Sequence, residues 1–365
     1  MLAGLGMQFR SLEYGDEPKS ETPFRIFAAL LHRTLGDFTD QLLFAASVAE
    51  MFPEARLDVC FRPDRPFKPE IVSLAPQVTS SWETKNRMPI DLFDTAGMRP
   101  IFGPEAWYVA GCDAPDLVLT PSMCEREKLG YFEPSARFRI PESDHWDARL
   151  RDAVGDGGFC ILHYREAGYE FSQAGTTRNI DTWEVEPVVD VLLRQGVRVV
   201  RIGHPEMAPL RQRDGYVDLC AAPFMLQACA ISHARFFMEV SPSGPYAIAN
   251  GFGVPMARCN ALIPSGPSTP DSIVLARPVL DGKGKNVTAD IVAGGLNPIQ
   301  FITDNSDHRL GANSIEQIAS VAADLIAATE AVSGWRGQPV EAPDDAVEPP
   351  FTWPIPKRAR HRIAV

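Results

Sequence analysis

The apolar positions in the first third of the chain follow a strand–helix–strand order. Residues 24–33, FRIFAALLHR, form a short continuous apolar run between polar residues, which predicts a buried strand. A glycine-containing loop leads into residues 42–52, LLFAASVAEMF, whose composition predicts a helix. Residues 55–61, ARLDVCF, alternate as a strand does, and residues 115–122 are typical of a later strand of the same sheet. This order predicts a parallel α/β domain.

The pattern starts again after residue 157. Residues 158–165, GFCILHYR, predict a strand, and residues 197–203, VRVVRIG, predict the next one. The segment between them carries valines and leucines at helical spacing. Asp181 and Glu184 form a capping pair at its start, and Gly196 ends it.

A further unit follows in residues 234–259. The apolar run ARFFMEV is followed by the small residues SPSG, by PYAIAN, which predicts a helix, and by the strand-like run VPMARC. Residues 313–332 then predict an amphipathic helix with Ser314 and Gln317 as its capping pair. The second half therefore predicts a second α/β domain.

Residues 140–158 are polar, charged and end in glycines, which is the composition of a connection between domains. We therefore expect two Rossmann-like doubly wound α/β domains in tandem. The predicted parts are a flexible N-terminus at 1–22, an N-terminal domain at 23–145, a C-terminal domain at 146–333, and a C-terminal tail or strap at 334–365.

Composition narrows the possible partners. The chain has 365 residues, of which 45% are hydrophobic and 22% charged, as in ordinary globular proteins. Its net charge of −12 disfavours a nucleic acid partner, which requires a basic face. The chain shows neither a signal peptide nor an apolar run that could span a bilayer, so we expect a cytoplasmic protein without an integral membrane segment.

Several familiar motifs are missing. No GxGxxG follows a strand, which disfavours a dinucleotide-binding dehydrogenase, and DGKGKN at 281–286 departs from the P-loop pattern. There is no HExxH, no GxSxG and no DxD, the aspartate pair with which many nucleotide-sugar enzymes hold a divalent metal. Seven scattered cysteines without a CxxC pair argue against disulfides and against a zinc site. We therefore expect no metal and no cofactor.

Polar residues that could bind an anion follow the strands of the second half. Arg165 ends one predicted strand, and Arg178 lies in the loop after it. Ser241, Ser243, Gly244 and Pro245 form the corner that begins a helix. Because the carboxyl ends of parallel strands share one edge, where ligands of doubly wound folds bind, these residues predict a phosphate site. Alternatively, Arg165 makes a surface salt bridge and the corner is an ordinary strand-to-helix turn.

Two histidines lie near the same edge. His163 falls inside a predicted strand, where a packed histidine is a simpler interpretation than a histidine that contacts a bound ligand. Gly203 ends the strand predicted at 197–203 and His204 follows it, so His204 could lie over a base or ribose, and a solvated turn explains it equally well.

Four blocks of the second half resemble a known family. Residues 160–171, 176–203, 234–260 and 311–326 resemble, in order and spacing, the C-terminal half of an uncharacterised bacterial glycosyltransferase family. More distantly they resemble the GT-B enzymes, including heptosyltransferases and fucosyltransferases. In the first half only residues 33–59 resemble the heptosyltransferase opening, in which a Gly-Asp loop follows the first strand.

The resemblance implies a GT-B fold, in which an acceptor domain and a donor domain face each other across a cleft. It places Arg165 on the arginine that contacts the donor diphosphate, and Ser243 with Gly244 on the turn that heads the donor-binding helix. Asp37 falls on the aspartate proposed as general base, with Asp40 in reserve, although a helix N-cap would also explain Asp37. SPSGP replaces the Asp-Thr-Gly of heptosyltransferases, so their donor does not carry over.

These observations predict a metal-independent, inverting glycosyltransferase. It would move a sugar from a nucleoside diphosphate sugar to a small-molecule or glycan acceptor, in polysaccharide or natural-product synthesis. The alternatives are a nucleotide-sugar epimerase or hydrolase, a non-catalytic nucleotide-sugar-binding subunit, and an unrelated α/β protein with similar turns.

Overall fold

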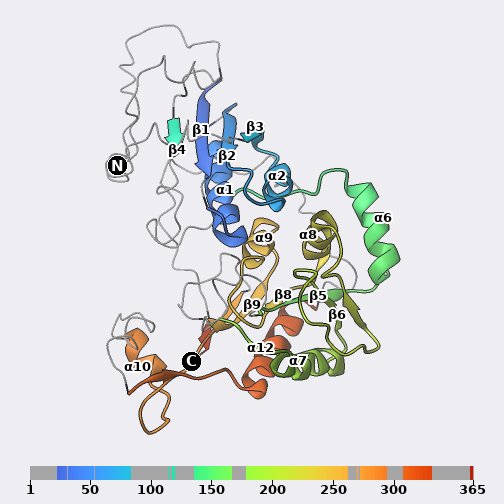
Figure 1. The fold of residues 1–365 in the computed structure, drawn as a ribbon, viewed down its shortest axis with the longest axis vertical. Helices are drawn as coiled ribbons and strands as arrows, with labels where there is room; N and C mark the ends of the chain where they lie inside the picture. The colour runs from blue at the N-terminus through green and yellow to red at the C-terminus, as the bar shows by residue number, and fades with distance from the viewer. Residues whose placement is uncertain are drawn as a thin grey trace. The chain divides into compact units, whose positions relative to one another are not determined.

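The chain divides into two compact units, Met1–Pro141 and Glu142–Val365, each built on a parallel sheet (Figure 1). The predicted boundary after residue 145 falls inside a helix of the second unit. The computed structural model describes residues 23–30, 32–52, 54–83, 115, 117–119, 135–166, 178–261, 269, 272–293, 307–330 and 362–364.

The first unit contains a four-stranded parallel sheet in the order β3-β2-β1-β4. The strands predicted at 24–33, 55–61 and 115–122 are confirmed as β1, β2 and β4 of this sheet. The predicted helix is α1, which begins seven residues before its apolar run because a polar first turn carries no apolar signal. The elements are β1 (Arg25–Leu30), α1 (Leu35–Glu50), β2 (Arg56–Phe61), α2 (Phe67–Ser73), β3 (Val78–Glu83) and β4 (Leu117–Leu119).

The second unit contains a seven-stranded parallel sheet in the order β13-β10-β9-β8-β5-β6-β7. Its strands are β5 (Phe159–His163), β6 (Arg198–Arg201), β7 (Tyr216–Asp218), β8 (Phe237–Glu239), β9 (Met256–Ala261), β10 (Ile273–Ala276) and β13 (Arg362–Ala364). Its helices are α6 (Ser143–Val154), α7 (Thr182–Arg194), α8 (Phe224–His233), α9 (Tyr246–Gly251), α10 (Thr288–Ala293) and α12 (Ile315–Ala328). A small antiparallel hairpin pairs β11 (Val279–Leu280) with β12 (Arg309–Leu310).

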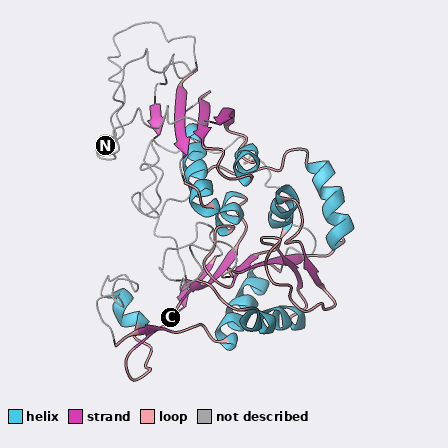
Figure 2. Ribbon diagram, viewed as in Figure 1, coloured by secondary structure: helices cyan, strands magenta, loops and turns pink. Residues whose placement is uncertain are grey.

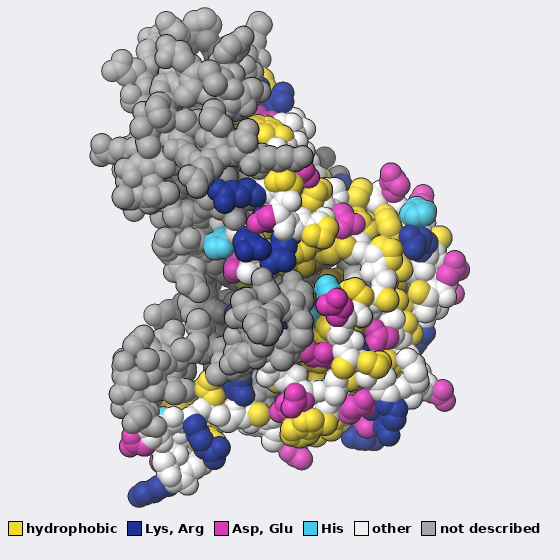
Figure 3. All heavy atoms as spheres, in the orientation of Figure 1, with side chains coloured by type: hydrophobic (Ala, Val, Ile, Leu, Met, Phe, Trp, Pro, Cys, Tyr) yellow, Lys and Arg dark blue, Asp and Glu magenta, His cyan; other side chains and the backbone are white. Residues whose placement is uncertain are grey.

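Helices cover both faces of the seven-stranded sheet. The helices α7 and α12 pack together on one face, and α8 and α9 lie on the other (Figures 1 and 2). Apolar side chains of β5, β6, β8 and β9 fill one core with those of α7 and α12. Over the coloured surface of this unit in Figure 3, acidic side chains lie scattered among hydrophobic and basic ones.

The predicted helix caps of the second unit are confirmed. Asp181 and Glu184 form a reciprocal capping box at the start of α7, and Ser314 does the same with Gln317 at the start of α12. Gly196 follows α7 with a φ of 79°, a conformation that glycine adopts at little cost. These caps fix where both helices begin and, for α7, where it ends.

Two segments differ from the sequence-based expectation. Residues 140–158, interpreted as a connection, contain α6, whose Leu150 and Val154 are buried. Only two of its twelve residues are buried, so the helix has too few apolar positions to stand out in the sequence. The predicted tail at 334–365 ends in β13, which pairs in parallel with β10, whereas residues 331–361 lie outside the described residues.

The strand order shows which edge of the second sheet corresponds to the ligand-binding edge of other doubly wound folds. From β7, the six strands β7, β6, β5, β8, β9 and β10 follow the Rossmann order 3-2-1-4-5-6. The order reverses between β5 and β8, and ligands of such sheets bind outside the carboxyl ends of the strands at this switch point. None of the described helices is long and apolar enough to cross a membrane.

Candidate functional site

The residues after β5 and β8 meet at the switch point. The Val240 amide donates to the His163 carbonyl oxygen at 2.9 Å. The Arg165 amide donates to the hydroxyl oxygen of Ser241 at 2.9 Å, and Ser241 is fully buried. The structure therefore brings the predicted Arg165 and Ser241 together at the place where a doubly wound sheet binds its ligand.

The segment that carries Arg178 is held beside Arg165. The Ile180 amide donates to the Arg165 carbonyl oxygen at 3.0 Å. Arg178 precedes Ile180 by two residues, which span no more than about 7 Å of chain. Both arginines are half-buried, and residues 167–177 lie outside the described residues. The backbones of the two arginines thus lie at the same corner of the sheet.

A buried carboxylate at the end of β8 accepts hydrogen bonds from the turn that follows the strand. Glu239 is the last residue of β8, and one of its oxygens accepts hydrogen bonds from the Ser243 amide at 2.6 Å and from the Ser243 hydroxyl at 3.1 Å. Its other oxygen accepts from Nε of Arg258 at 2.7 Å. The Arg258 guanidinium also lies 4.0 Å from the centre of the Tyr246 ring. The Ser243 amide is therefore already paired with an anion of the protein itself.

Gly244 and Pro245 form the start of α9. The Gly244 carbonyl oxygen accepts from the Ala247 amide at 3.1 Å, and Pro245 is the N-cap residue. Because α9 has only six residues, its aligned peptide dipoles are fewer than those of a long helix. Glu239 thus already accepts from the Ser243 amide of the SPSGP corner, and Arg165 with Arg178 are the stronger groups for an anion.

His163 is a packed, neutral side chain. Its Nδ1 lies 3.0 Å from the Ile202 carbonyl oxygen, which can only accept, so the proton resides on Nδ1. Burial is the main cause that lowers the pKa of His163 to about 4; the hydrogen bond to Ile202 opposes this shift, and the guanidinium charges of Arg201 and Arg165 add to it. The imidazole therefore stays uncharged at neutral pH and fixes the end of β5 against the end of β6.

This lowered pKa makes stability depend on pH. In the unfolded chain a histidine binds its proton near pH 6.5, whereas folded His163 binds it only near pH 4. Between these values the unfolded state binds more protons, so stability is lost as the pH falls from 6.5 to 4, by about 3 kcal/mol. Urea unfolding at several pH values checks this. His163→Asn keeps a donor for Ile202 and should lack this loss, and an unchanged pH dependence in that variant would contradict the assignment.

Gly203 and His204 follow β6. The Gly203 amide donates to Oε1 of Gln227 at 2.9 Å, and a β-carbon at residue 203 would lie 2.3 Å from the Met207 sulfur, so a larger residue there would require the Met207 side chain to move. The Glu206 amide donates to Nδ1 of His204 at 3.3 Å, and the His204 side chain is 40% exposed. His204 is thus accessible in a turn at the same edge of the sheet. It follows β6, which is separated from β8 by β5.

A group of buried charged residues beside the switch point was not predicted from the sequence. Arg201 is fully buried and donates to Asp218 at 2.9 Å and to the Tyr164 hydroxyl at 2.6 Å. It also lies 3.3 Å from Glu166. Burial alone would raise the pKa of Asp218, but the hydrogen bond from the Cys220 amide and the Arg201 charge hold that pKa below its usual range. The available signal was a charged residue inside an apolar run, which requires a buried partner.

Asp37 lies at the carboxyl edge of the other sheet. Thr34 is the N-cap of α1, and Asp37 is the third residue of the helix, so the N-cap interpretation of Asp37 is wrong. Its carboxylate accepts a hydrogen bond from the Thr34 hydroxyl, and the residue is exposed. Asp40 lies one turn farther along α1 and is half-buried. Of the two, Asp37 has the accessibility that a general base requires.

Solved structures of other proteins have a similar fold, although no sequence comparison finds a match. No protein-family model matches the chain, and no curated protein sequence matches it. Among solved structures, the glycosyl transferase family 9 protein of Veillonella parvula is similar, with 14% identity, a TM-score of 0.52, and coverage of 84% of this chain and 99% of that one. The ADP-heptose lps heptosyltransferase II of E. coli is similar with 11% identity, a TM-score of 0.53, and coverage of 84% and 100%. The chain therefore has the two-domain α/β fold of the GT-B glycosyltransferases.

Proposed function

We propose that the chain is a glycosyltransferase that takes a sugar from a nucleoside diphosphate donor bound at the switch point of the second unit. The observation that carries this proposal is the junction of Arg165, Ser241 and the Arg178 segment outside the carboxyl ends of β5 and β8. Two arginines suit a diphosphate because their planar guanidinium groups make charge-assisted, often bidentate hydrogen bonds. The likeness to an ADP-heptose heptosyltransferase supports the same donor class.

The chemistry requires a stabilised leaving group. The bond between the anomeric carbon and the phosphate oxygen breaks while the acceptor oxygen forms a bond to the opposite face of that carbon, through an oxocarbenium-like state. The electron pair of the broken bond stays on the departing diphosphate. Arg165 and Arg178 stabilise this growing negative charge, so we propose that no divalent metal is needed at the diphosphate.

The acceptor loses a proton during this attack. We propose Asp37 as the base that takes it, since its carboxylate is exposed in the first turn of α1. Attack from the face opposite to the leaving group inverts the configuration of the sugar. The acceptor is a small molecule or a glycan that presents a hydroxyl or amine group.

Arg165→Ala should weaken binding of the nucleoside diphosphate about 10- to 100-fold, because a hydrogen bond to a charged group contributes about 1.5–3 kcal/mol. A thermal-shift screen with UDP, GDP, dTDP, ADP and CMP identifies the ligand, and calorimetry then measures its dissociation constant. Arg194→Ala is the matched control, since Arg194 is exposed in the last turn of α7 and should leave the affinity unchanged.

The same calorimetry tests metal independence and the competing functions. Affinity in metal-free buffer should equal affinity with added Mg²⁺ or Mn²⁺. Equal binding by Arg165→Ala and the parent protein would contradict the proposed site. A product formed from the nucleotide sugar without any acceptor would instead indicate an epimerase or a hydrolase, and donor binding without turnover across a broad acceptor panel would indicate a binding subunit.

A further inference from the structure

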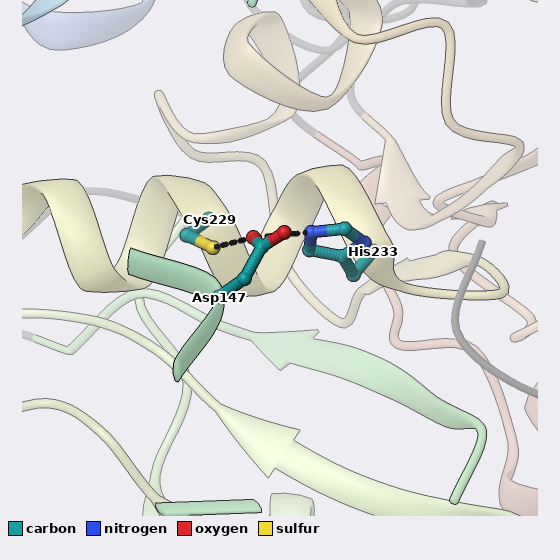
Figure 4. Close-up of side chains that lie close together, drawn as sticks. All are labelled: Asp147, Cys229 and His233. Carbon is teal, nitrogen blue, oxygen red and sulfur yellow. Dashed lines mark hydrogen bonds and ion pairs between the residues drawn. The ribbon is translucent and has the colours of Figure 1, made fainter. Parts of the chain in front are cut away.

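Three side chains with metal-binding atoms meet between α6 and α8, in a place that the proposed function does not use. Figure 4 shows the Asp147 carboxylate of α6 between the Cys229 thiol and the His233 imidazole of α8. Oδ1 of Asp147 lies 2.8 Å from Nε2 of His233 and 3.4 Å from Sγ of Cys229. One ligand atom of each residue lies within 4.8 Å of the others.

The backbone holds these groups in place. Cys229 and His233 are four residues apart on α8, so they project from the same face of that helix. Cys229 is fully buried and His233 is 5% exposed, whereas the Asp147 side chain is 20% exposed. Leu150 and Val154 of α6 are buried as well. The cluster is therefore preformed by packed helices and reaches solvent on the side of Asp147.

We propose that Asp147, Cys229 and His233 bind a zinc ion. Sulfur, imidazole nitrogen and carboxylate oxygen are the atoms that Zn²⁺ takes as ligands, at about 2.3, 2.0–2.1 and 2.0–2.2 Å. Tetrahedral bonds of these lengths separate neighbouring ligand atoms by roughly 3.3–3.7 Å, so the observed 2.8 and 3.4 Å require shifts of less than about 1 Å. A thiolate, a carboxylate and a neutral imidazole also balance the charge of the ion, which a buried site requires.

The site lies away from the proposed donor site. His233 precedes the first residue of β8 by four positions, whereas the donor is proposed at the other end of that strand. A bound ion would fasten α6, the first helix of the second unit, to α8. Three protein ligands leave one coordination position for water. The inference does not depend on the proposed function.

Cobalt substitution of the full chain tests the proposal. After dialysis against a chelator, the protein should bind one equivalent of Co²⁺ with the strong visible absorption of tetrahedral cobalt and a sulfur-to-cobalt charge-transfer band. Zn²⁺ should displace the cobalt and raise the unfolding temperature. Cys229→Ala should lose the charge-transfer band, and both it and Asp147→Asn should bind Zn²⁺ at least about 10- to 100-fold more weakly, since even loss of a residue that only orients a ligand costs that much.

Asp147→Asn keeps a hydrogen-bond acceptor for His233, so circular dichroism should show that this variant still folds. Cys259→Ala, which changes a buried cysteine of β9, is the matched control and should bind zinc as the parent does. The proposal is overturned if the parent binds no cobalt, if the bound cobalt gives an octahedral spectrum without the sulfur band, or if Asp147→Asn binds zinc as tightly as Cys259→Ala.

Discussion

Asp37→Asn should lower the turnover number about 100- to 10,000-fold, the range that a positioned general base contributes. Asparagine has the shape of aspartate and can still accept a hydrogen bond from the Thr34 hydroxyl, but it cannot take a proton from the acceptor. The dissociation constant of the donor should not change, because the donor is proposed to bind in the other unit. Release of nucleoside diphosphate in the presence of the acceptor measures the turnover number.

Two other variants make this result specific. Glu50→Gln makes the same carboxylate-to-amide change at the far end of α1 and should turn over normally. Asp40→Asn tests the reserve base on the same helix. A near-normal turnover number for Asp37→Asn, or a larger loss for Asp40→Asn than for Asp37→Asn, would show that the assignment of Asp37 is wrong.

Glu239→Met should lower the free energy of unfolding by about 3–5 kcal/mol, which is the usual cost of removing one partner of a buried ion pair. Glu239 is fully buried, and its loss leaves the Arg258 guanidinium and the Ser243 amide without their carboxylate acceptor. Urea unfolding measures the change. Glu206→Met, at a side chain that is 78% exposed, is the control and should change stability by no more than about 0.5 kcal/mol.

A double variant separates the charge pair from the packing. Glu239→Met combined with Arg258→Met removes both charges, and replacement of a buried pair by apolar residues is often neutral. The double variant should therefore be more stable than Glu239→Met alone. Arg258→Met alone is measured as well. If the losses of stability of the two single variants simply add in the double variant, Glu239 and Arg258 are not coupled, and the turn after β8 is held in another way.

The fold was largely predictable because periodicity and caps are local signals. The apolar runs of β1, β2, β5, β6, β8 and β9 and the capping boxes of α7 and α12 are legible in short windows of sequence. Short or weakly apolar elements gave no such signal. The strand β7 has only three residues. The helix α2 has seven residues and contains Pro69, and proline is tolerated in the first turn of a helix but disrupts its interior. The strand β13 depends on pairing with β10, which lies far away in the sequence.

The sequence predicted at which edge of the sheet the candidate site lies, but it did not predict which side chains there form hydrogen bonds with each other. A parallel sheet brings strand ends together, so Arg165 and Ser241 could be placed at one edge from the pattern alone. That Glu239 would accept from the Ser243 amide depends on a turn of the backbone and on Arg258 in the next strand. The cluster of Asp147, Cys229 and His233 was missed for the same reason, because its carboxylate lies 82 residues before the cysteine. Cysteine spacing alone cannot reveal a mixed ligand set of this kind.

A crystal structure with the bound nucleoside diphosphate tests the central claim most directly. The diphosphate should lie outside the carboxyl ends of β5 and β8, with its oxygens within hydrogen-bond distance of the Arg165 guanidinium. A diphosphate bound at any other edge of either sheet, or held at this edge without a contact to Arg165, would contradict the proposed site.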